Sequence, residues 1–180
     1  MKRILTMLLT FVLALGLMSC GKSSSNSQSS TVAVEKIIDV NQFARITSED
    51  LKKIMGEPEN IEDWNFDSSN GKSYQTKTYT YKNSQFEFMI IDNSVVRMNI
   101  HSEKYNKTDG KSITFNDEKS LFSILGIEPS SNVKKVADTG AALKYQLVSD
   151  KVAEVWVAIM DKKAKTMDEI KITYNLNYFS

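Results

Sequence analysis

Hydrophobic and polar residues alternate with a period of two in short segments of both halves of the chain. These segments are residues 79–81, 86–90, 96–100, 143–147, 155–159 and 170–174. Such alternation predicts β-strands with one buried face, on which Val96, Met98 and Ile100 are expected to lie. Polar turn residues at 82–84 and 92–93 separate the first segments. Each half is therefore predicted to form an antiparallel meander of three or four strands.

A helix pattern precedes the alternating segments in each half. Residues 51–58 and 121–129 both carry apolar side chains at positions i, i+3 and i+4, followed by a glycine and then a proline. Gly56 and Gly126 suit the left-handed conformation that ends a helix, and the prolines prevent its continuation. The expected capping residues at the helix starts are Thr47 with Asp50, and Asn116 with Asp117. One short helix is therefore predicted before each meander.

The two halves repeat the same order of elements, which indicates an internal duplication. We expect residues 32–110 to form the first helix-meander repeat and residues 111–180 the second. Each repeat has one helix to cover one apolar sheet face. The predicted fold class is therefore α+β, with two tandem repeats of a helix followed by an antiparallel β-meander. Together the repeats are expected to form a continuous sheet with helices on one face and an open second face.

The first residues of the chain have the pattern of an export signal. Lys2 and Arg3 precede an apolar stretch that runs to residue 18, and a small residue, Ser19, stands before Cys20. The apolar stretch is shorter than the roughly 20 residues that a spanning helix needs. Residues 1–19 are therefore predicted to be a lipoprotein signal peptide that is removed.

Cys20 is the expected point of membrane attachment. The segment 17–20, Leu-Met-Ser-Cys, resembles the lipobox of bacterial lipoproteins, which implies a diacylglyceryl group on Cys20. Cys20 is the only cysteine, so lipidation also accounts for an exported thiol that no internal disulfide can use. The alternative is ordinary signal-peptidase cleavage beside an incidental cysteine. Serine-rich residues 20–31 are expected to be a flexible tether, which places the protein on the extracytoplasmic face of the cell membrane.

Charge and the residue inventory exclude several function classes. Removing Lys2 and Arg3 from the 23 basic residues leaves 21 against 22 acidic ones, and nucleic acid is bound by an excess of basic side chains. His101 is the only histidine and is expected at the surface, so neither a catalytic triad nor a zinc site is predicted. The neighbouring carboxylates of Glu62 and Asp63 would point to opposite sides of an extended chain. We therefore expect no enzyme activity, no cofactor, no metal and no nucleic-acid partner.

Several local motifs match those of a known group of proteins. They are residues 46–51 at the first helix start, 56–58 at its end, the strand segments 79–81 and 86–88, and the turn at 92–96. Over residues 41–176 this order resembles the tandem helix-plus-meander proteins, which include outer-membrane assembly lipoproteins of the SmpA and OmlA type and the β-lactamase inhibitor proteins. The chain is also similar to uncharacterised lipoproteins of low-GC Gram-positive bacteria. These resemblances imply a protein-binding or assembly role rather than catalysis.

Strand positions that alternate with the buried ones define a candidate binding surface on the open sheet face. Its expected partner-binding residues are Trp156, Met160, Arg97, Met89 and Lys171. Aromatic residues and arginine carry much of the energy of protein interfaces, so an envelope protein is the expected partner. Two alternatives stay open: Trp156 packs under a loop, or the protein is a small-ligand or cell-wall-associated receptor that uses a cleft between the repeats. Trp64 and Phe66, expected in the loop after the first helix, present the same choice between interface and core.

Overall fold

The computed structural model describes residues 35–102, 113–163 and 165–179 of the 180-residue chain. The predicted signal peptide (1–19), Cys20 and the tether that ends at residue 31 lie outside the described residues. None of the described helices is long and apolar enough to span a membrane.

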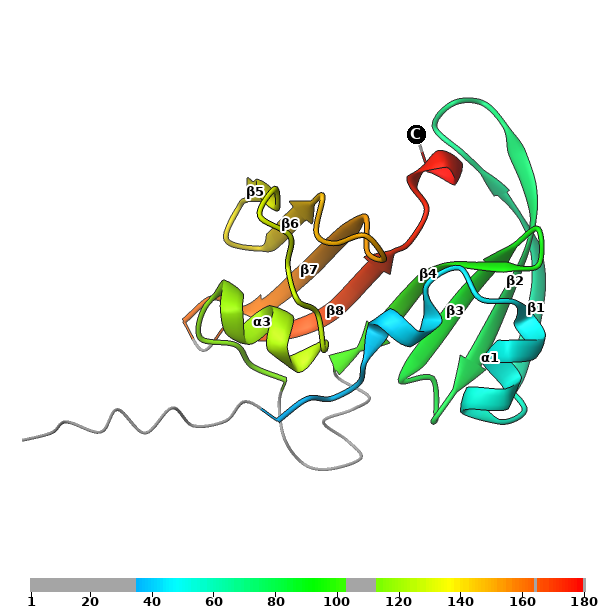
Figure 1. Cartoon of the computed structure of the whole chain (residues 1–180), viewed down its shortest axis with the longest axis horizontal. Coiled ribbons are helices and arrows are strands. Elements are labelled where there is room, and N and C mark those ends of the chain that lie inside the picture. The colour runs from blue at the N-terminus through cyan, green and yellow to red at the C-terminus, as the bar shows by residue number, and fades with distance from the viewer. Residues whose placement is uncertain (1–34, 103–112, 164, 180) are drawn as a thin grey trace, which may run out of the picture. The chain divides into compact units, whose positions relative to one another are not determined.

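In the described part of the chain, eight antiparallel strands form one continuous sheet in the order β1-β2-β3-β4-β8-β7-β6-β5 (Figure 1). The strands are β1 (Asn60–Asp67), β2 (Ser73–Tyr81), β3 (Phe86–Ile91), β4 (Ser94–His101), β5 (Lys134–Asp138), β6 (Ala142–Gln146), β7 (Glu154–Asp161) and β8 (Thr166–Thr173). Strands β1 to β4 and β5 to β8 are consecutive meanders, and their last strands, β4 and β8, pair at the centre of the sheet. The predicted α+β class with tandem helix-meander repeats and a continuous sheet is confirmed.

The helices begin at the capping residues that the sequence predicts. Their bounds are α1 (Ser48–Met55) and α3 (Glu118–Ile124), with short 3-10 helices at η1 (Val40–Phe43) and η2 (Leu176–Tyr178). The Thr47 hydroxyl accepts a hydrogen bond of 3.1 Å from the Asp50 backbone N–H. The Asp117 carboxylate accepts one of 2.7 Å from the backbone N–H of Ser120, whose hydroxyl in turn accepts from the Asp117 backbone N–H. This reciprocal pair is a capping box, and it fixes the start of α3.

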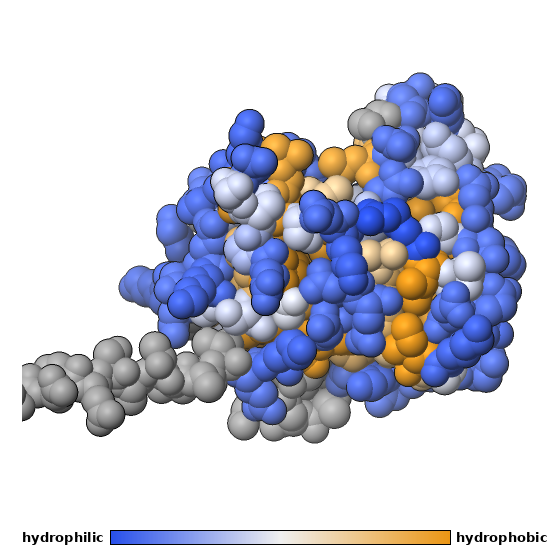
Figure 2. All heavy atoms as spheres, viewed as in Figure 1, coloured by the Kyte–Doolittle hydropathy of each residue, from blue (hydrophilic) through white to orange (hydrophobic). Residues whose placement is uncertain are grey.

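Both helices lie on the same face of the sheet and bury the main hydrophobic core there (Figure 1). Leu51 of α1 and Leu121 and Phe122 of α3 are almost fully buried. They belong to one cluster with strand residues such as Phe88 and Tyr145, so each helix covers the apolar face of its own meander. Figure 2 shows hydrophilic side chains over much of the helix side, with hydrophobic side chains visible between them.

Residues before α1 connect the two repeats. The backbone N–H of Val40 donates to the carbonyl of Leu125 at the end of α3, and the hydroxyl of the buried Tyr174 donates to the Val40 carbonyl at 2.8 Å. Arg45 reaches the second repeat as well, because one Nη atom donates to the Tyr174 carbonyl at 2.8 Å and the other to the Asp150 carbonyl at 3.1 Å. These bonds hold residues 40–45 against the second repeat.

The sequence prediction for Trp64 and Phe66 is wrong about their secondary structure. Both lie in β1, an edge strand of the sheet, and not in a loop. Every residue of β1 except Phe66 is exposed. An edge strand that buries neither face has no need of apolar alternation, so the pattern that reveals the other strands is missing here.

The predicted facing of Val96 is also wrong. Val96 does not join Met98 and Ile100 in the main core but packs with Met89 and Ile91 on the opposite face of the sheet. The cause is a β-bulge, because the pairing of β3 with β4 changes register between Met89 and Ile90. An extra residue in one strand puts two neighbours on the same side and reverses the alternation beyond it.

Candidate functional site

Cross-strand pairing shows where the predicted partner-binding residues lie. Met89 on β3 pairs with Arg97 on β4, and Trp156 on β7 pairs with Lys171 on β8. The strand neighbours of Trp156 and Lys171 belong to the main core, so these two side chains point to the face away from the helices. Met160 lies near the end of β7, beside an irregular pairing, and is 55% exposed.

Ion pairs surround the half-buried Trp156. The Nζ atom of Lys171 lies 5.0 Å from the centre of the indole ring and 3.3 Å from a carboxylate oxygen of Glu169. Lys144, which pairs with Trp156 from β6, has its Nζ atom 3.0 Å from a carboxylate oxygen of the buried Glu154. A lysine that lies over an indole face adds a cation–π attraction to its ion pair. Trp156 therefore lies between two lysines of the neighbouring strands, each paired with its own carboxylate.

The C-terminal residues hold Arg97 against the sheet. Its guanidinium lies 3.6 Å from the centre of the Phe179 ring, and its Nε donates a hydrogen bond of 3.2 Å to the Thr173 hydroxyl. Burial lowers the pKa of Arg97 from its ordinary value, while the charges of Glu154 and Glu169 act in the opposite direction. An arginine pKa starts so high that the side chain stays charged. Within the described residues, the donors on the two Nη atoms of Arg97 are left for solvent or a ligand.

Part of the face away from the helices is covered by the same C-terminal residues. A second apolar cluster forms there, with Met89, Ile91 and Val96 buried and Phe66, Tyr74, Tyr178 and Phe179 packed against them. The Tyr178 hydroxyl also donates a hydrogen bond of 3.0 Å to an Asp92 carboxylate oxygen. Met89 is only 8% exposed, so little of this predicted contact residue reaches the surface.

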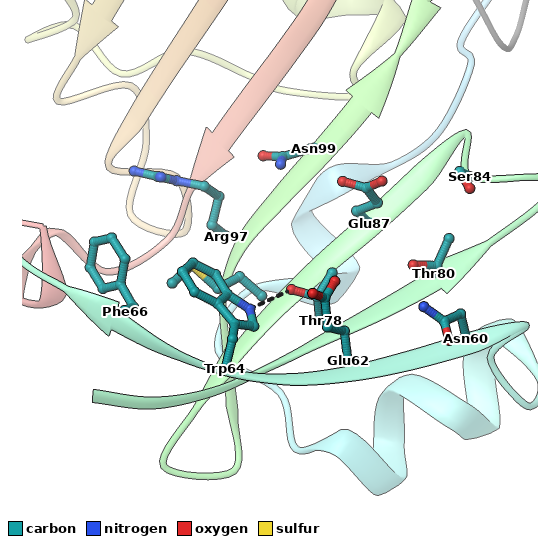
Figure 3. Close-up of a pocket in the computed structure, with 11 residues that line it drawn as sticks. Asn60, Glu62, Trp64, Phe66, Thr78, Thr80, Ser84, Glu87, Arg97 and Asn99 are labelled. Atoms are coloured by element: carbon teal, nitrogen blue, oxygen red, sulfur yellow. Dashed lines mark hydrogen bonds between the residues drawn. The ribbon is translucent and has the colours of Figure 1, made fainter. Parts of the chain in front are cut away.

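A pocket of about 420 Å³ lies on the first meander (Figure 3). The residues that line it are Asn60, Glu62, Trp64 and Phe66 from β1, Thr78 and Thr80 from β2, Ser84 from the following turn, Glu87 and Met89 from β3, and Arg97 and Asn99 from β4. All four strands of the first repeat contribute, and no residue of the second repeat does. This pocket therefore differs in place from the cleft between repeats that the sequence suggested.

The aromatic side chains of the pocket are fixed by their neighbours. The Trp64 Nε1 donates a hydrogen bond of 3.0 Å to the Thr78 hydroxyl, as the dashed line in Figure 3 shows. The indole also meets the Phe66 ring edge to face, with ring centres 5.9 Å apart, and Phe66 in turn contacts Phe179. Aromatic pairs favour this geometry. The position of Trp64 is thus set before any ligand arrives.

His101 lies beside this pocket, next to the lining residue Glu87, and Asn99 is one of the residues that line it. His101, predicted as a surface residue, is half-buried, and its Nε2 lies 3.0 Å from a carboxylate oxygen of Glu87. The Oδ1 atom of Asn99 is buried without a hydrogen-bond partner among the described residues. Within the described ranges, no group of three or more histidine, cysteine, aspartate or glutamate side chains could hold a metal ion.

Sequence reasoning missed most of the polar residues of the pocket. Of the lining residues, only Arg97 and Met89 belong to the predicted binding surface, and Asn60, Glu62 and Asn99 are not among the site residues that the sequence predicts. One signal was present, because the aromatic residues Trp64 and Phe66 are separated by the single polar residue Asn65. That signal indicates a strand with one functional face, although it contains too few apolar residues to be detected by hydrophobic alternation.

Comparison with known proteins finds a distant structural similarity. No family model matches the chain, and no curated protein matches it either. Among solved structures, the chain is similar to a cysteine-rich secretory protein from Staphylococcus aureus subsp. aureus Mu50, with 11% sequence identity and a TM-score of 0.40. The match covers 79% of this chain and 51% of that protein, so this chain spans about half of its length.

Proposed function

We propose that this protein is a non-catalytic binding module, held on the extracytoplasmic face of the cell membrane by a lipid on Cys20, whose open sheet face binds an envelope protein. The observation that carries the proposal is the environment of Trp156. Its indole lies on the face that neither α1 nor α3 covers, between Lys144 and Lys171.

The environment of Trp156 matches the physical requirements of an interface anchor. Large aromatic side chains contribute most at the centre of an interface, where burial on binding is complete. An anchor that is already held in place loses little conformational freedom when the partner arrives. Lys171 restrains the indole before binding, at 5.0 Å from the ring centre. Because Lys144 and Lys171 are each paired with a carboxylate, the partner does not have to neutralise an isolated charge.

The predicted tether supports the same function. Residues 21–31 contain no apolar side chain, and a flexible chain of this length reaches roughly 20 Å. That reach would lift the folded domain away from the lipid head groups and leave its open sheet face available to a membrane neighbour. Two acyl chains would hold the protein far more firmly than the marginal grip of a single chain.

Crosslinking in the native membrane tests the proposal. Full-length protein carrying Trp156→Ala is compared with the wild type and with Ile54→Ala, which removes a 44% exposed apolar side chain from α1 on the helix side. We expect the wild type and Ile54→Ala to crosslink to the same envelope protein, and Trp156→Ala to lose that product while its melting temperature remains close to that of Ile54→Ala. An undiminished product with Trp156→Ala would refute the proposed surface.

A mass measurement tests the anchor separately. Protein extracted from the membrane should begin at Cys20 and carry the mass of the lipid, and Cys20→Ser should not acquire that mass. A mature protein that begins at another residue and carries no lipid would refute the anchoring, without bearing on the Trp156 surface.

A further inference from the structure

We propose that the pocket on the first meander is a second binding site and that its ligand is an uncharged saccharide. The site uses strands β1 to β4, whereas Trp156 and its lysines lie on β6 to β8. The inference therefore does not depend on a protein partner for the Trp156 surface.

Trp64 supplies the platform for a sugar ring. Its Nε1 is already bonded to the Thr78 hydroxyl, so the indole offers a ligand its flat face and not its polar edge. The side chain is 38% exposed, although tryptophan is on average a highly buried residue. One side of a pyranose ring carries polarised C–H groups, and these are attracted to the negative face of an aromatic ring.

The polar lining suits groups that both donate and accept hydrogen bonds. Figure 3 shows Trp64 and Phe66 towards one end of the pocket and Asn60, Thr80 and Ser84 towards the other. Amide and hydroxyl side chains such as these three offer donors and acceptors together. A saccharide hydroxyl has the same double character, so a ring of hydroxyls can satisfy such a lining without adding charge.

The charged residues of the pocket argue against a ligand with a net charge. Glu62 and Glu87 would repel an anion, and the positive charge of Arg97 would offset much of their attraction for a cation. Arg97 instead provides neutral ligands with two sets of Nη donors, since its own hydrogen bond goes from Nε to Thr173. The hydroxyl groups of a neutral ligand can donate to the Glu62 carboxylate and accept from the Arg97 guanidinium.

Asn99 gives an independent sign that the pocket is incomplete without a ligand. Its buried Oδ1 has no hydrogen-bond partner among the described residues, and such an acceptor carries a free-energy cost. The volume of about 420 Å³ lies within the usual range for small-molecule sites, about 300 to 1,000 Å³.

Tryptophan fluorescence provides a direct assay. The chain has two tryptophans, so Trp156→Phe leaves Trp64 as the only indole. The full chain with this substitution is titrated with tetrasaccharides of β-1,4-linked N-acetylglucosamine, β-1,4-linked glucose and α-1,4-linked glucose. A zwitterionic tripeptide serves as a probe of a different class. We expect a saturable change in Trp64 emission with at least one saccharide and none with the tripeptide.

Calorimetric titration of variants then locates the site. Trp64→Leu and Asn99→Leu should each weaken saccharide binding about tenfold or more, and Trp64→Phe should weaken it less because an aromatic face remains. Ile54→Ala should bind as the wild type does. Circular dichroism melting checks that each variant is folded. The proposal is overturned if no saccharide saturates by about 10 mM, if Trp64→Leu and Asn99→Leu bind normally, or if only the tripeptide binds.

Discussion

Removing the hydroxyl of Tyr174 tests the contact that joins the residues before α1 to the central strands. Tyr174 follows β8 and is 2% exposed, and its hydroxyl donates a hydrogen bond of 2.8 Å to the Val40 carbonyl. The same hydroxyl lies 3.8 Å from the sulfur of Met98 on β4. Because phenylalanine keeps the ring, Tyr174→Phe removes little besides this hydrogen bond.

The expected loss of stability in Tyr174→Phe follows from the burial of the Tyr174 hydroxyl and the Val40 carbonyl. A hydrogen bond contributes about 0.5–1.5 kcal/mol net, and a buried polar group left without its partner costs about 1–3 kcal/mol. We therefore expect Tyr174→Phe to lower the free energy of unfolding by about 1–2 kcal/mol. For a domain of this size, each kcal/mol corresponds to a fall in melting temperature of roughly 2–4 °C.

Tyr81→Phe is the matched control, because the buried Tyr81 hydroxyl has no hydrogen-bond partner among the described residues. Removing that hydroxyl should leave the free energy of unfolding unchanged or raise it. Urea unfolding of both variants and the wild type measures the difference, provided that the denaturant slope stays constant. Equal stability of Tyr174→Phe and wild type, or an equal loss in both variants, would refute this reasoning.

Alkaline pH gives a second measurement on the same residue. Burial raises the pKa of the Tyr174 phenol well above its ordinary value. An unfolded tyrosine loses its proton near pH 10, while the folded one keeps it. The free energy of unfolding therefore has its full value below about pH 10 and falls as the pH rises further. Tyr174→Phe should make this fall shallower, by up to about 1.4 kcal/mol per pH unit. The buried Tyr145, whose pKa is raised to about 12, contributes to the fall in both proteins.

Three further predictions concern local structure. Gly126→Ala should lower the melting temperature more than Gly71→Ala does. Both glycines have positive φ, so an alanine is strained at either position. A Cβ at Gly126 would also lie 3.1 Å from the Asp39 Cα, whereas one at Gly71 would meet nothing within 4 Å. Asp117→Ala should lower the urea midpoint while Asp117→Asn keeps the cap. Because the hydrogen bond from the Ser120 backbone lowers the pKa of Asp117, any advantage of aspartate over asparagine should be present above about pH 4 and lost as the pH falls. Arg45→Lys should cost about 1–3 kcal/mol in chemical unfolding, because one ammonium cannot replace the forked donors that bind the carbonyls of Tyr174 and Asp150.

Local sequence signals predicted the helix ends and most strands because these depend on neighbouring residues. Thr47 caps α1 through a backbone N–H three residues away, and Gly56 ends it with a φ of 85° that glycine adopts freely. Apolar alternation found β2, β3 and β4 because each of these strands buries side chains towards the helices. The order of helix and meander in both halves then predicted the fold class.

The sequence failed where the result depends on partners far away in the chain. The bulge beside Met89 exists only in the pairing of β3 with β4, and it reversed the predicted facing of Val96. The sequence also gave no sign that Phe179 would stack on the guanidinium of Arg97, more than eighty positions before it. The sequence could place Arg97 on an open face but could not predict what covers it there.

By itself, then, the sequence determined the tandem repeat, the helix caps and the buried face of most strands, since hydrogen bonds over a few residues and the period of apolar positions decide them. Only the tertiary structure decided that β4 pairs with β8, that the C-terminal residues cover part of the second face, and that four strands enclose a pocket beside Trp64. These features come from contacts between distant segments, and their geometry depends on register and bulges that no local pattern specifies.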